Sequence, residues 1–174
     1  MKMKYLIRLF LTIFLLFPMV GYANQEDNTA FRDFNWGESL EEIQKERKTV
    51  RIGHNSTYNF EYYVASFKLK ETHYLMGYPI VGDGFVVAFW NDKLFMVGSL
   101  FEDREEYYLG VLGSMMKRYG MPEYDEKNDQ YYWDDNGVQY ILTKKDCPGY
   151  FMVGIISFSI FTDTFGVEKA DQGW

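Results

Sequence analysis

The sequence predicts an α+β fold: a single twisted antiparallel sheet of about six or seven strands, with two helices on one face. Three observations predict it. Phe85–Phe101 consists of two apolar runs joined by a short polar link, which is typical of an antiparallel hairpin. Helix signals mark two further segments, Leu40–Lys48 and Glu102–Gly120. Neither strand of the hairpin has a polar face, so other elements are expected to cover both of its sides.

Residues 1–23 are predicted to be a secretory signal peptide. A basic start is followed by the apolar stretch Leu9–Val20, and the small residues Gly21 and Ala23 place the cleavage site after Ala23. The alternative is an uncleaved membrane anchor, because Tyr5–Ala23 is close to the roughly 20 apolar residues that a spanning helix needs. We expect an exported protein, periplasmic or secreted, with no stable membrane insertion after cleavage.

The rest of the chain is predicted to form one domain. Residues 24–30 are expected to be a disordered lead, 31–161 a single α+β domain and 162–174 a flexible tail. Cleavage would leave 15 basic against 25 acidic residues, a net charge of −10. This balance argues against a nucleic-acid partner and against attraction to anionic lipid. Aromatic residues make up 20% of the chain, which suits packed sheets and binding surfaces alike.

The two helices are predicted from their ends. Ser39 and Glu42 match a capping box, which places a helix over about Leu40–Lys48. In Glu102–Gly120, Asp103 is the expected N-cap, acidic residues occupy the first turn and basic residues the last, in agreement with the helix dipole. Gly120 is expected to end the helix, because glycine readily adopts the left-handed backbone conformation found just after helix C-termini.

The remaining segments alternate between strands and polar connections. Arg51–Thr57 is interpreted as a polar link and Glu123–Asp129 as an acidic loop. The strands expected besides the central hairpin are Tyr58–Phe67, Thr72–Ile80 (a weak strand, interrupted by a glycine and a proline), Gln130–Trp133, Val138–Thr143 and Tyr150–Ile160. Because Tyr150–Ile160 is nearly uncharged, we expect it to lie centrally in the sheet.

Motifs for catalysis, metals or cofactors are missing from the sequence. There is no glycine-rich phosphate loop, no nucleophile elbow and no paired cysteine motif, so no cofactor is predicted. His54 and His73 lie in separate segments, and each is interpreted as exposed or hydrogen-bonded. Cys147 is the sole cysteine, which excludes an internal disulfide, and is interpreted as a turn residue.

The acidic loop is the other candidate for chemistry. Asp125, Glu126, Asn128 and Asp129 could line a calcium loop, but Lys127 occupies the third position, where an oxygen ligand is required. We interpret these residues as solvated turns. Paired carboxylates for glycoside hydrolysis stay open, because the sequence does not give their separation in space.

Two short motifs carry a resemblance. Trp36–Ile43 reads W-G-x-S-x-E-E-I, and Tyr119–Pro122 reads Y-G-x-P before a hairpin that contains Trp133. The pattern resembles small exported bacterial proteins of unassigned function. More distantly, it is similar to the helix-plus-sheet module of the β-lactamase-inhibitor-protein-like group, which includes outer-membrane assembly lipoproteins. The resemblance implies a binding scaffold without catalytic residues, although the lipid-bearing cysteine of those lipoproteins is missing here.

The predicted function is an exported binding or interaction module without catalysis. Two helices can cover only part of the sheet, so the opposite face should present aromatic residues to an envelope or extracellular protein or polymer. The residues expected to be exposed there are Tyr62, Trp90, Phe95 and Trp133. Alternatively, these aromatics pack against loops or the sheet's own curvature. Two further alternatives are a hydrolase of envelope polymer that uses the acidic-loop carboxylates and a carrier for a small apolar ligand inside a curled sheet.

Overall fold

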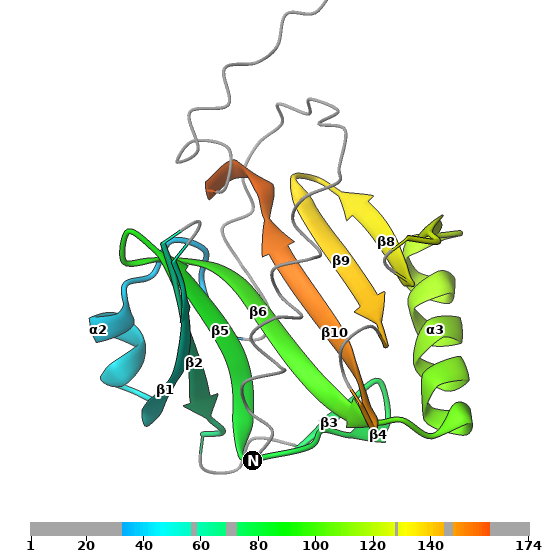
Figure 1. Cartoon of the computed structure of the whole chain (residues 1–174), viewed down its shortest axis with the longest axis horizontal. Helices are drawn as coiled ribbons and strands as arrows, with labels where there is room; N and C mark the ends of the chain where they lie inside the picture. The colour runs from blue at the N-terminus through cyan, green and yellow to red at the C-terminus, as the bar shows by residue number, and fades with distance from the viewer. Residues whose placement is uncertain (1–32, 57–58, 69–72, 128, 145–147, 161–174) are drawn as a thin grey trace, which may run out of the picture.

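The structure is a computed structural model, and it describes residues 33–56, 59–68, 73–127, 129–144 and 148–160 (Figure 1). The predicted signal peptide, the lead, the tail and Cys147 lie outside these residues. The predicted α+β class is confirmed, because a large antiparallel sheet is accompanied by a few helices.

The main sheet has eight strands, more than the six or seven predicted. In spatial order they are β1 (Thr49–Asn55), β2 (Phe60–Ser66), β5 (Gly84–Trp90), β6 (Lys93–Glu102), β10 (Tyr150–Ser157), β9 (Val138–Thr143), β8 (Gln130–Asp135) and β7 (Glu123–Asp125). All neighbouring strands are antiparallel. The two strands that the prediction missed are the edges β1 and β7, whose polar sequences resemble a link and a loop. The C-terminal strand β10 lies centrally, as predicted.

Two tight turns set the register of the sheet. Asn91 and Asp92, between β5 and β6, both have positive φ (46° and 60°), and so do Asn136 and Gly137 between β8 and β9 (48° and 82°). This is the geometry that joins twisted antiparallel strands with two residues. The central hairpin is therefore confirmed. Its register shifts after Ala88, which leaves Phe95 as an extra residue in β6.

The first helix, α2 (Leu40–Gln44), is shorter than predicted. Its capping box is confirmed, with the Glu42 N–H donating to Ser39 Oγ over 3.2 Å and the Ser39 N–H donating to the Glu42 carboxylate over 2.8 Å. The Leu40 N–H donates to Asp92 Oδ1 over 3.0 Å, which ties the helix to the central hairpin. Its last turn tightens into i→i−3 hydrogen bonds, and the helix ends there.

The second helix, α3 (Glu105–Tyr119), begins later than predicted. The prediction that Asp103 caps it is wrong: the N-cap is Arg104, which makes no side-chain cap, and Asp103 instead pairs with Lys144 Nζ over 2.7 Å. At the other end Gly120 has a φ of 87° and its N–H donates to the Met116 carbonyl, so the helix ends where predicted.

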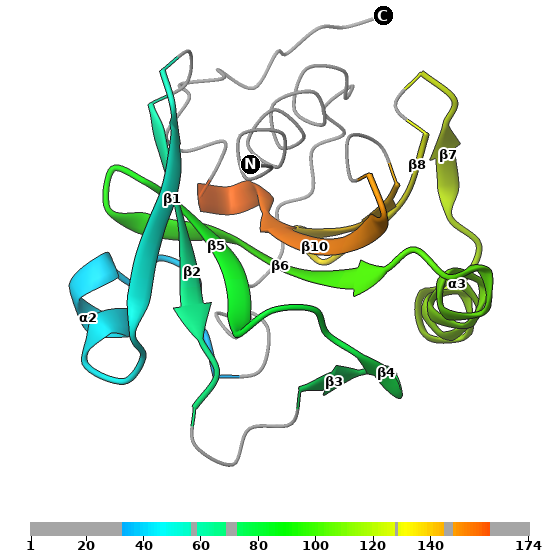
Figure 2. The ribbon, with the colours of Figure 1, turned by 60° about the horizontal axis from the view of Figure 1, so that its bottom comes forward.

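Both helices lie on the same side of a curled sheet (Figure 2). The first apolar cluster, which we call the convex-face cluster, includes Ile43 of α2 and Val111 and Met115 of α3. It also packs against the separate hairpin formed by β3 (Tyr74–Leu75) and β4 (Tyr78–Pro79), the outcome of the predicted weak strand. The second cluster, on the opposite side, is the concave-face cluster. Its buried members are Phe60, Tyr62, Val86, Ala88, Trp90, Phe95, Met96, Ile141, Met152 and Ile156.

Candidate functional site

The predicted binding aromatics divide between the two faces. Tyr62, Trp90 and Phe95 share the concave face, whereas Trp133 belongs to the convex-face cluster. Placing Trp133 with the others was wrong, because alternation along β8 turns it toward α3 and turns Tyr132 toward the concave face. Its indole Nε1–H donates to the Gly120 carbonyl over 2.9 Å.

The expectation that these four side chains are exposed is also wrong. Their exposed fractions are 1% for Tyr62, 9% for Trp90, 1% for Phe95 and 4% for Trp133. Trp133 is buried by the convex-face packing that includes α3. The other three lie in the concave-face cluster, to which neither α2 nor α3 contributes a residue in the part of the chain that the structure describes. Their role in binding stays a prediction.

One end of the concave face is built from aromatic rings. Phe60 packs edge-on against Trp90 with ring centroids 6.0 Å apart, and tilted against Phe95 at 4.8 Å. The register places Phe60 opposite Trp90, and the bulge in β6 adds Phe95 to the same face. We call these three residues the aromatic corner. Such pairs contribute about 0.5–1.5 kcal/mol each beyond their buried area, so the three rings hold one another in place.

The centre of the concave face has little side-chain material. Gly98 of β6 and Gly154 of β10 are paired directly, with Val86 opposite Gly98 and Ile141 opposite Gly154. Among the described residues, Met152 is the side chain that reaches over them: a Cβ on Gly98 would lie 3.7 Å from its Sδ, and one on Gly154 3.6 Å from its Cε. Methionine is flexible and adapts to irregular contacts. The two paired glycines therefore form a shallow depression in the concave face, which we call the glycine floor, and the flexible side chain of Met152 covers it.

The other end of the face carries three buried polar side chains. Gln139 Nε2 donates to Asp134 Oδ1 over 2.9 Å, and Thr143 Oγ1 donates to the Asp129 carbonyl over 3.2 Å. Gln130 differs from these two: its exposed fraction is 0%, and neither Oε1 nor Nε2 has a hydrogen-bond partner within the described chain. A buried amide that lacks both partners is rare and calls for an explanation.

The register shows that Gln130 belongs to the concave face. It pairs with Thr143, which pairs with Met152, which pairs with Leu100, and cross-strand partners share a face. Met152 is a member of the concave-face cluster and Leu100 packs against it. The sequence could not single out this glutamine, because an uncharged polar residue at the start of a strand carries no signal of burial.

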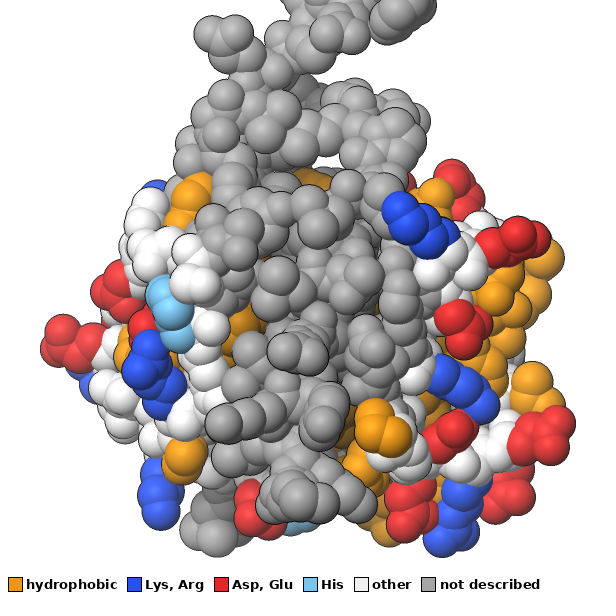
Figure 3. All heavy atoms as spheres, in the orientation of Figure 1, with side chains coloured by type: hydrophobic (Ala, Val, Ile, Leu, Met, Phe, Trp, Pro, Cys, Tyr) orange, Lys and Arg blue, Asp and Glu red, His pale blue; other side chains and the backbone are white. Residues whose placement is uncertain are grey.

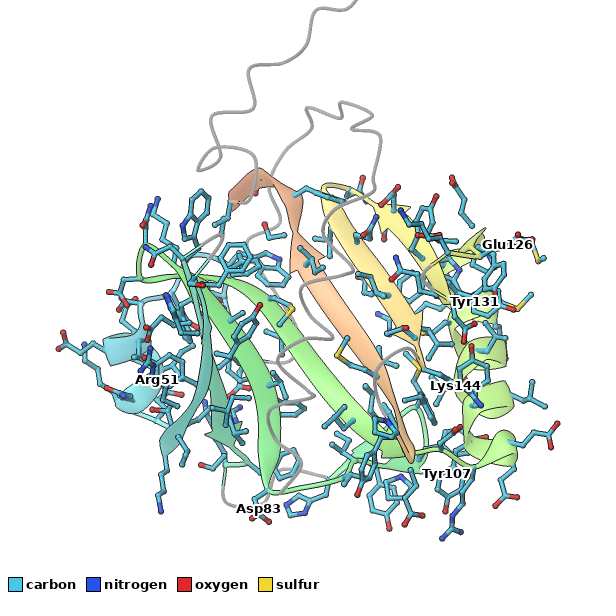
Figure 4. All side chains as sticks on the ribbon, in the orientation of Figure 1. Arg51, Asp83, Tyr107, Glu126, Tyr131 and Lys144 are labelled. Carbon is cyan, nitrogen blue, oxygen red and sulfur yellow. The ribbon has the colours of Figure 1, made fainter. Side chains whose placement is uncertain are left out.

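Charged side chains lie along both ends of the sheet (Figure 3). On the β1–β2 edge, Arg51 pairs with Glu61 over 2.7 Å (Figure 4). The Tyr63 hydroxyl donates to Glu61 over 2.8 Å, and this bond, with Arg51, lowers the pKa of Glu61. Burial and the bond to Glu61 raise the pKa of Tyr63 to about 12. On the β7–β8 edge, burial and a hydrogen bond to Glu123 raise the pKa of Tyr132 to about 12. These bonds tie each edge strand to its neighbour.

The other candidate residues do not converge on one site. His54 Nδ1 lies 3.5 Å from Glu61, whereas His73 stacks on Phe67 with centroids 4.2 Å apart. In the acidic loop, Asp125 accepts from the Lys127 N–H over 3.0 Å and Asp129 accepts from the Tyr124 hydroxyl over 3.0 Å. Among the described residues, no three His, Cys, Asp or Glu side chains gather as metal ligands, and no helix has the length and apolarity to cross a membrane.

The fold and its concave face define an α+β protein with a curled eight-stranded antiparallel sheet, α2 and α3 on its convex side, and on the other side an apolar cluster to which neither of these two helices contributes a described residue. Comparisons with models of protein families, with curated proteins and with solved structures find no match to this chain. The resemblance to the β-lactamase-inhibitor-protein-like group stays a prediction.

Proposed function

We propose that this protein is an exported binding module that uses the aromatic-rich concave face of its sheet and carries out no catalysis. The observation that supports it is the concave-face cluster itself. Ten buried apolar or aromatic residues gather on a sheet face to which α2 and α3 add nothing. Extended apolar surface on a folded domain needs a cover, and where helices do not supply it a ligand or partner is the common occupant.

The arrangement of the face favours binding over structure alone. The aromatic corner at one end supplies aromatic residues of the kind that dominate interface energetics. Because Gly98 and Gly154 have no side chains, a ligand can approach the backbone of the sheet closely there. The flexible side chain of Met152 can rearrange to fit that ligand. Concave, mostly apolar surfaces with a small number of polar groups are typical ligand sites. The apolar-ligand carrier is therefore the form of the proposal that the geometry supports best.

The hydrolase alternative has less support. A general acid at neutral pH needs a raised carboxyl pKa. Within the described chain, the three carboxyl groups with a shifted pKa, those of Asp33, Glu42 and Glu61, are all shifted downward by hydrogen bonds or by basic neighbours. Two carboxylates of the acidic loop, those of Asp125 and Asp129, are engaged in local turn contacts.

Binding of an uncharged apolar probe tests the proposal. N-phenyl-1-naphthylamine is titrated into the protein purified after export, and its fluorescence is followed. Trp90→Ala is expected to weaken binding by about tenfold or more, because anchor residues commonly contribute 2 kcal/mol or more. The matched control is Leu109→Ala, an apolar residue of α3 that is 55% exposed and lies outside both clusters.

Two results would contradict the proposal: no saturable binding by the native protein, or an equal loss in both variants. The near-ultraviolet circular dichroism of each variant has to match that of the native protein, because a loosened core binds such probes without specificity. If Trp90→Ala fails to fold, Phe95→Leu offers a smaller change in the same aromatic corner.

A further inference from the structure

We propose that the concave face binds a single acyl chain whose uncharged polar head is hydrogen-bonded by the side-chain amide of Gln130. This inference rests on the proposed function and names the ligand class of the same face. A long-chain alcohol, ester or amide has the chemistry required. Gln130 is assigned as the residue that binds the polar head. The acyl chain runs from there across the sheet, and its far end lies at the aromatic corner.

The buried amide of Gln130 is the first argument. A glutamine side chain has one carbonyl acceptor and two N–H donors. In Gln130 both the oxygen and the nitrogen are buried without partners in the described chain, whereas the neighbouring Gln139 and Thr143 on the same face each make a side-chain hydrogen bond. A native fold tolerates such a loss where a ligand restores the bonds. A hydroxyl, ester or amide head can accept from the Gln130 Nε2–H, and a hydroxyl or amide can also donate to its Oε1.

The path from Gln130 across the sheet is the second argument. The register links Gln130 to Thr143, Met152 and Leu100, so one row of positions runs from the amide into the apolar centre. Four strand spacings separate β8 from β5, a span of about 19 Å. Gly98 and Gly154 lower the floor midway along it. A slender chain fits over paired glycines more easily than a bulky ligand does, because, of the described side chains, only that of Met152 has to move aside.

The number of polar groups decides between a lipid and an extended peptide. Every residue of an extended peptide brings an N–H and a C=O that need partners once buried. Among the described residues at this end of the face, Gln139 and Thr143 each already make a hydrogen bond, whereas the side-chain N and O of Gln130 both lack one. A ligand with one polar end and an apolar remainder needs far fewer partners than an extended peptide does.

The charge of the face decides between an uncharged and an anionic head. The cross-strand row that begins at Gln130 continues through Thr143, Met152 and Leu100, and none of these side chains is charged. A buried carboxylate or phosphate without a counter-ion would be strongly disfavoured. Asp125, the cross-strand partner of Gln130 in β7, is negative, and so is Asp134, which accepts from Gln139. A neutral head is therefore expected to bind better than the corresponding fatty acid at neutral pH.

Displacement of N-phenyl-1-naphthylamine from the exported protein tests this inference. The competitors are 1-monopalmitoylglycerol, palmitate at pH 7 and a leucine–alanine peptide. The native protein is expected to bind 1-monopalmitoylglycerol about tenfold more tightly than palmitate, since one or two buried hydrogen bonds are gained. Gln130→Met, which keeps the length of the side chain, is expected to lose most of that preference. The control, Gln139→Met on the same face, is expected to keep it.

Each outcome supports or overturns the inference. A head preference that disappears in Gln130→Met and persists in Gln139→Met supports it. Equal affinity for both lipids, a preference unchanged by Gln130→Met, or displacement by the peptide alone would overturn it and leave the proposed function standing. If the probe does not bind the native protein at all, the proposed function fails as well. Gln130→Leu is the second variant should the methionine protein not fold.

Discussion

The two glycines of α3 give a matched pair of substitutions. A Cβ on Gly110 would lie 3.0 Å from Cε2 of the Tyr78 ring and closer still to its Cζ and hydroxyl, whereas a Cβ on Gly113 meets nothing within 4 Å. Tyr78 comes from the β3–β4 hairpin and packs against Tyr107 with ring centroids 5.3 Å apart. The hairpin therefore rests on the backbone of α3 at Gly110, where a side chain would push it away.

The expected effects have opposite signs. Alanine is favoured over glycine in a helix interior by about 1 kcal/mol, and Gly113→Ala should gain most of that. This gain corresponds to a rise in melting temperature of about 2–4 °C for a domain of this size. Gly110→Ala has the same intrinsic gain, but it forces an aromatic ring off its packed position, which costs about 1–3 kcal/mol. We expect Gly110→Ala to lower the free energy of unfolding by up to about 2 kcal/mol.

Urea unfolding followed by tryptophan fluorescence measures both variants. The decisive control repeats Gly110→Ala in a Tyr78→Ala background, where the clashing ring is gone. In that background the substitution should stabilise the protein as much as Gly113→Ala does, so the double-mutant cycle shows a coupling of about 1–3 kcal/mol. The reasoning is refuted if Gly110→Ala stabilises the native protein as much as Gly113→Ala, because α3 and the hairpin would then not be in contact.

Three further predictions concern stability and pH. Trp133→Phe is expected to lower the free energy of unfolding by about 1–3 kcal/mol in urea titrations, because it leaves a carbonyl after α3 without its indole donor, and to leave apolar-probe binding unchanged. Burial of Asp33 opposes its ionisation, but its bond to Lys68 and the charge of Arg47 together outweigh this and lower its pKa below 3.8. Its contribution is therefore present above pH 3.8 and lost as the pH falls through the folded-state value. The deficit of Asp33→Asn relative to the native protein should be modest at pH 7, as for exposed pairs, and should disappear near pH 3 in urea titrations at the two pH values. The phenol of Tyr63, with its pKa raised to about 12 by burial and by Glu61, favours folding fully below pH 10 and loses that contribution as the pH rises toward 12. Tyr63→Phe should remove one late-titrating group from the absorbance at 295 nm in this range, and an unchanged titration would contradict the assignment.

Local signals in the sequence were sufficient to predict several elements. The capping box of α2 and the turn at Asn91 and Asp92 are each specified by side chains within a few residues of one another. The edge strands β1 and β7 could not be predicted in the same way. Both are polar, and they become strands because neighbouring strands β2 and β8 offer them unpaired backbone groups.

The faces of the sheet were harder to predict than its strands. A shift of one residue moves every side chain to the other face. The prediction therefore placed Trp133 with Tyr62 and Trp90, although it packs beside α3. The bulge that turns Phe95 onto the concave face has no sequence signal that could have been used in advance.

The two ends of the proposed ligand site belong to parts of the sheet that are far apart in the sequence. The aromatic corner lies on β2, β5 and β6, whereas Gln130 lies on β8. They lie on the same sheet face because the C-terminal strand β10 inserts between β6 and β9 and pairs with both. The same insertion places Gly154 beside Gly98 and creates the low floor between the two ends. Acyl-chain binding and the preference for an uncharged head should consequently both depend on β10, although neither the aromatic corner nor Gln130 is part of it.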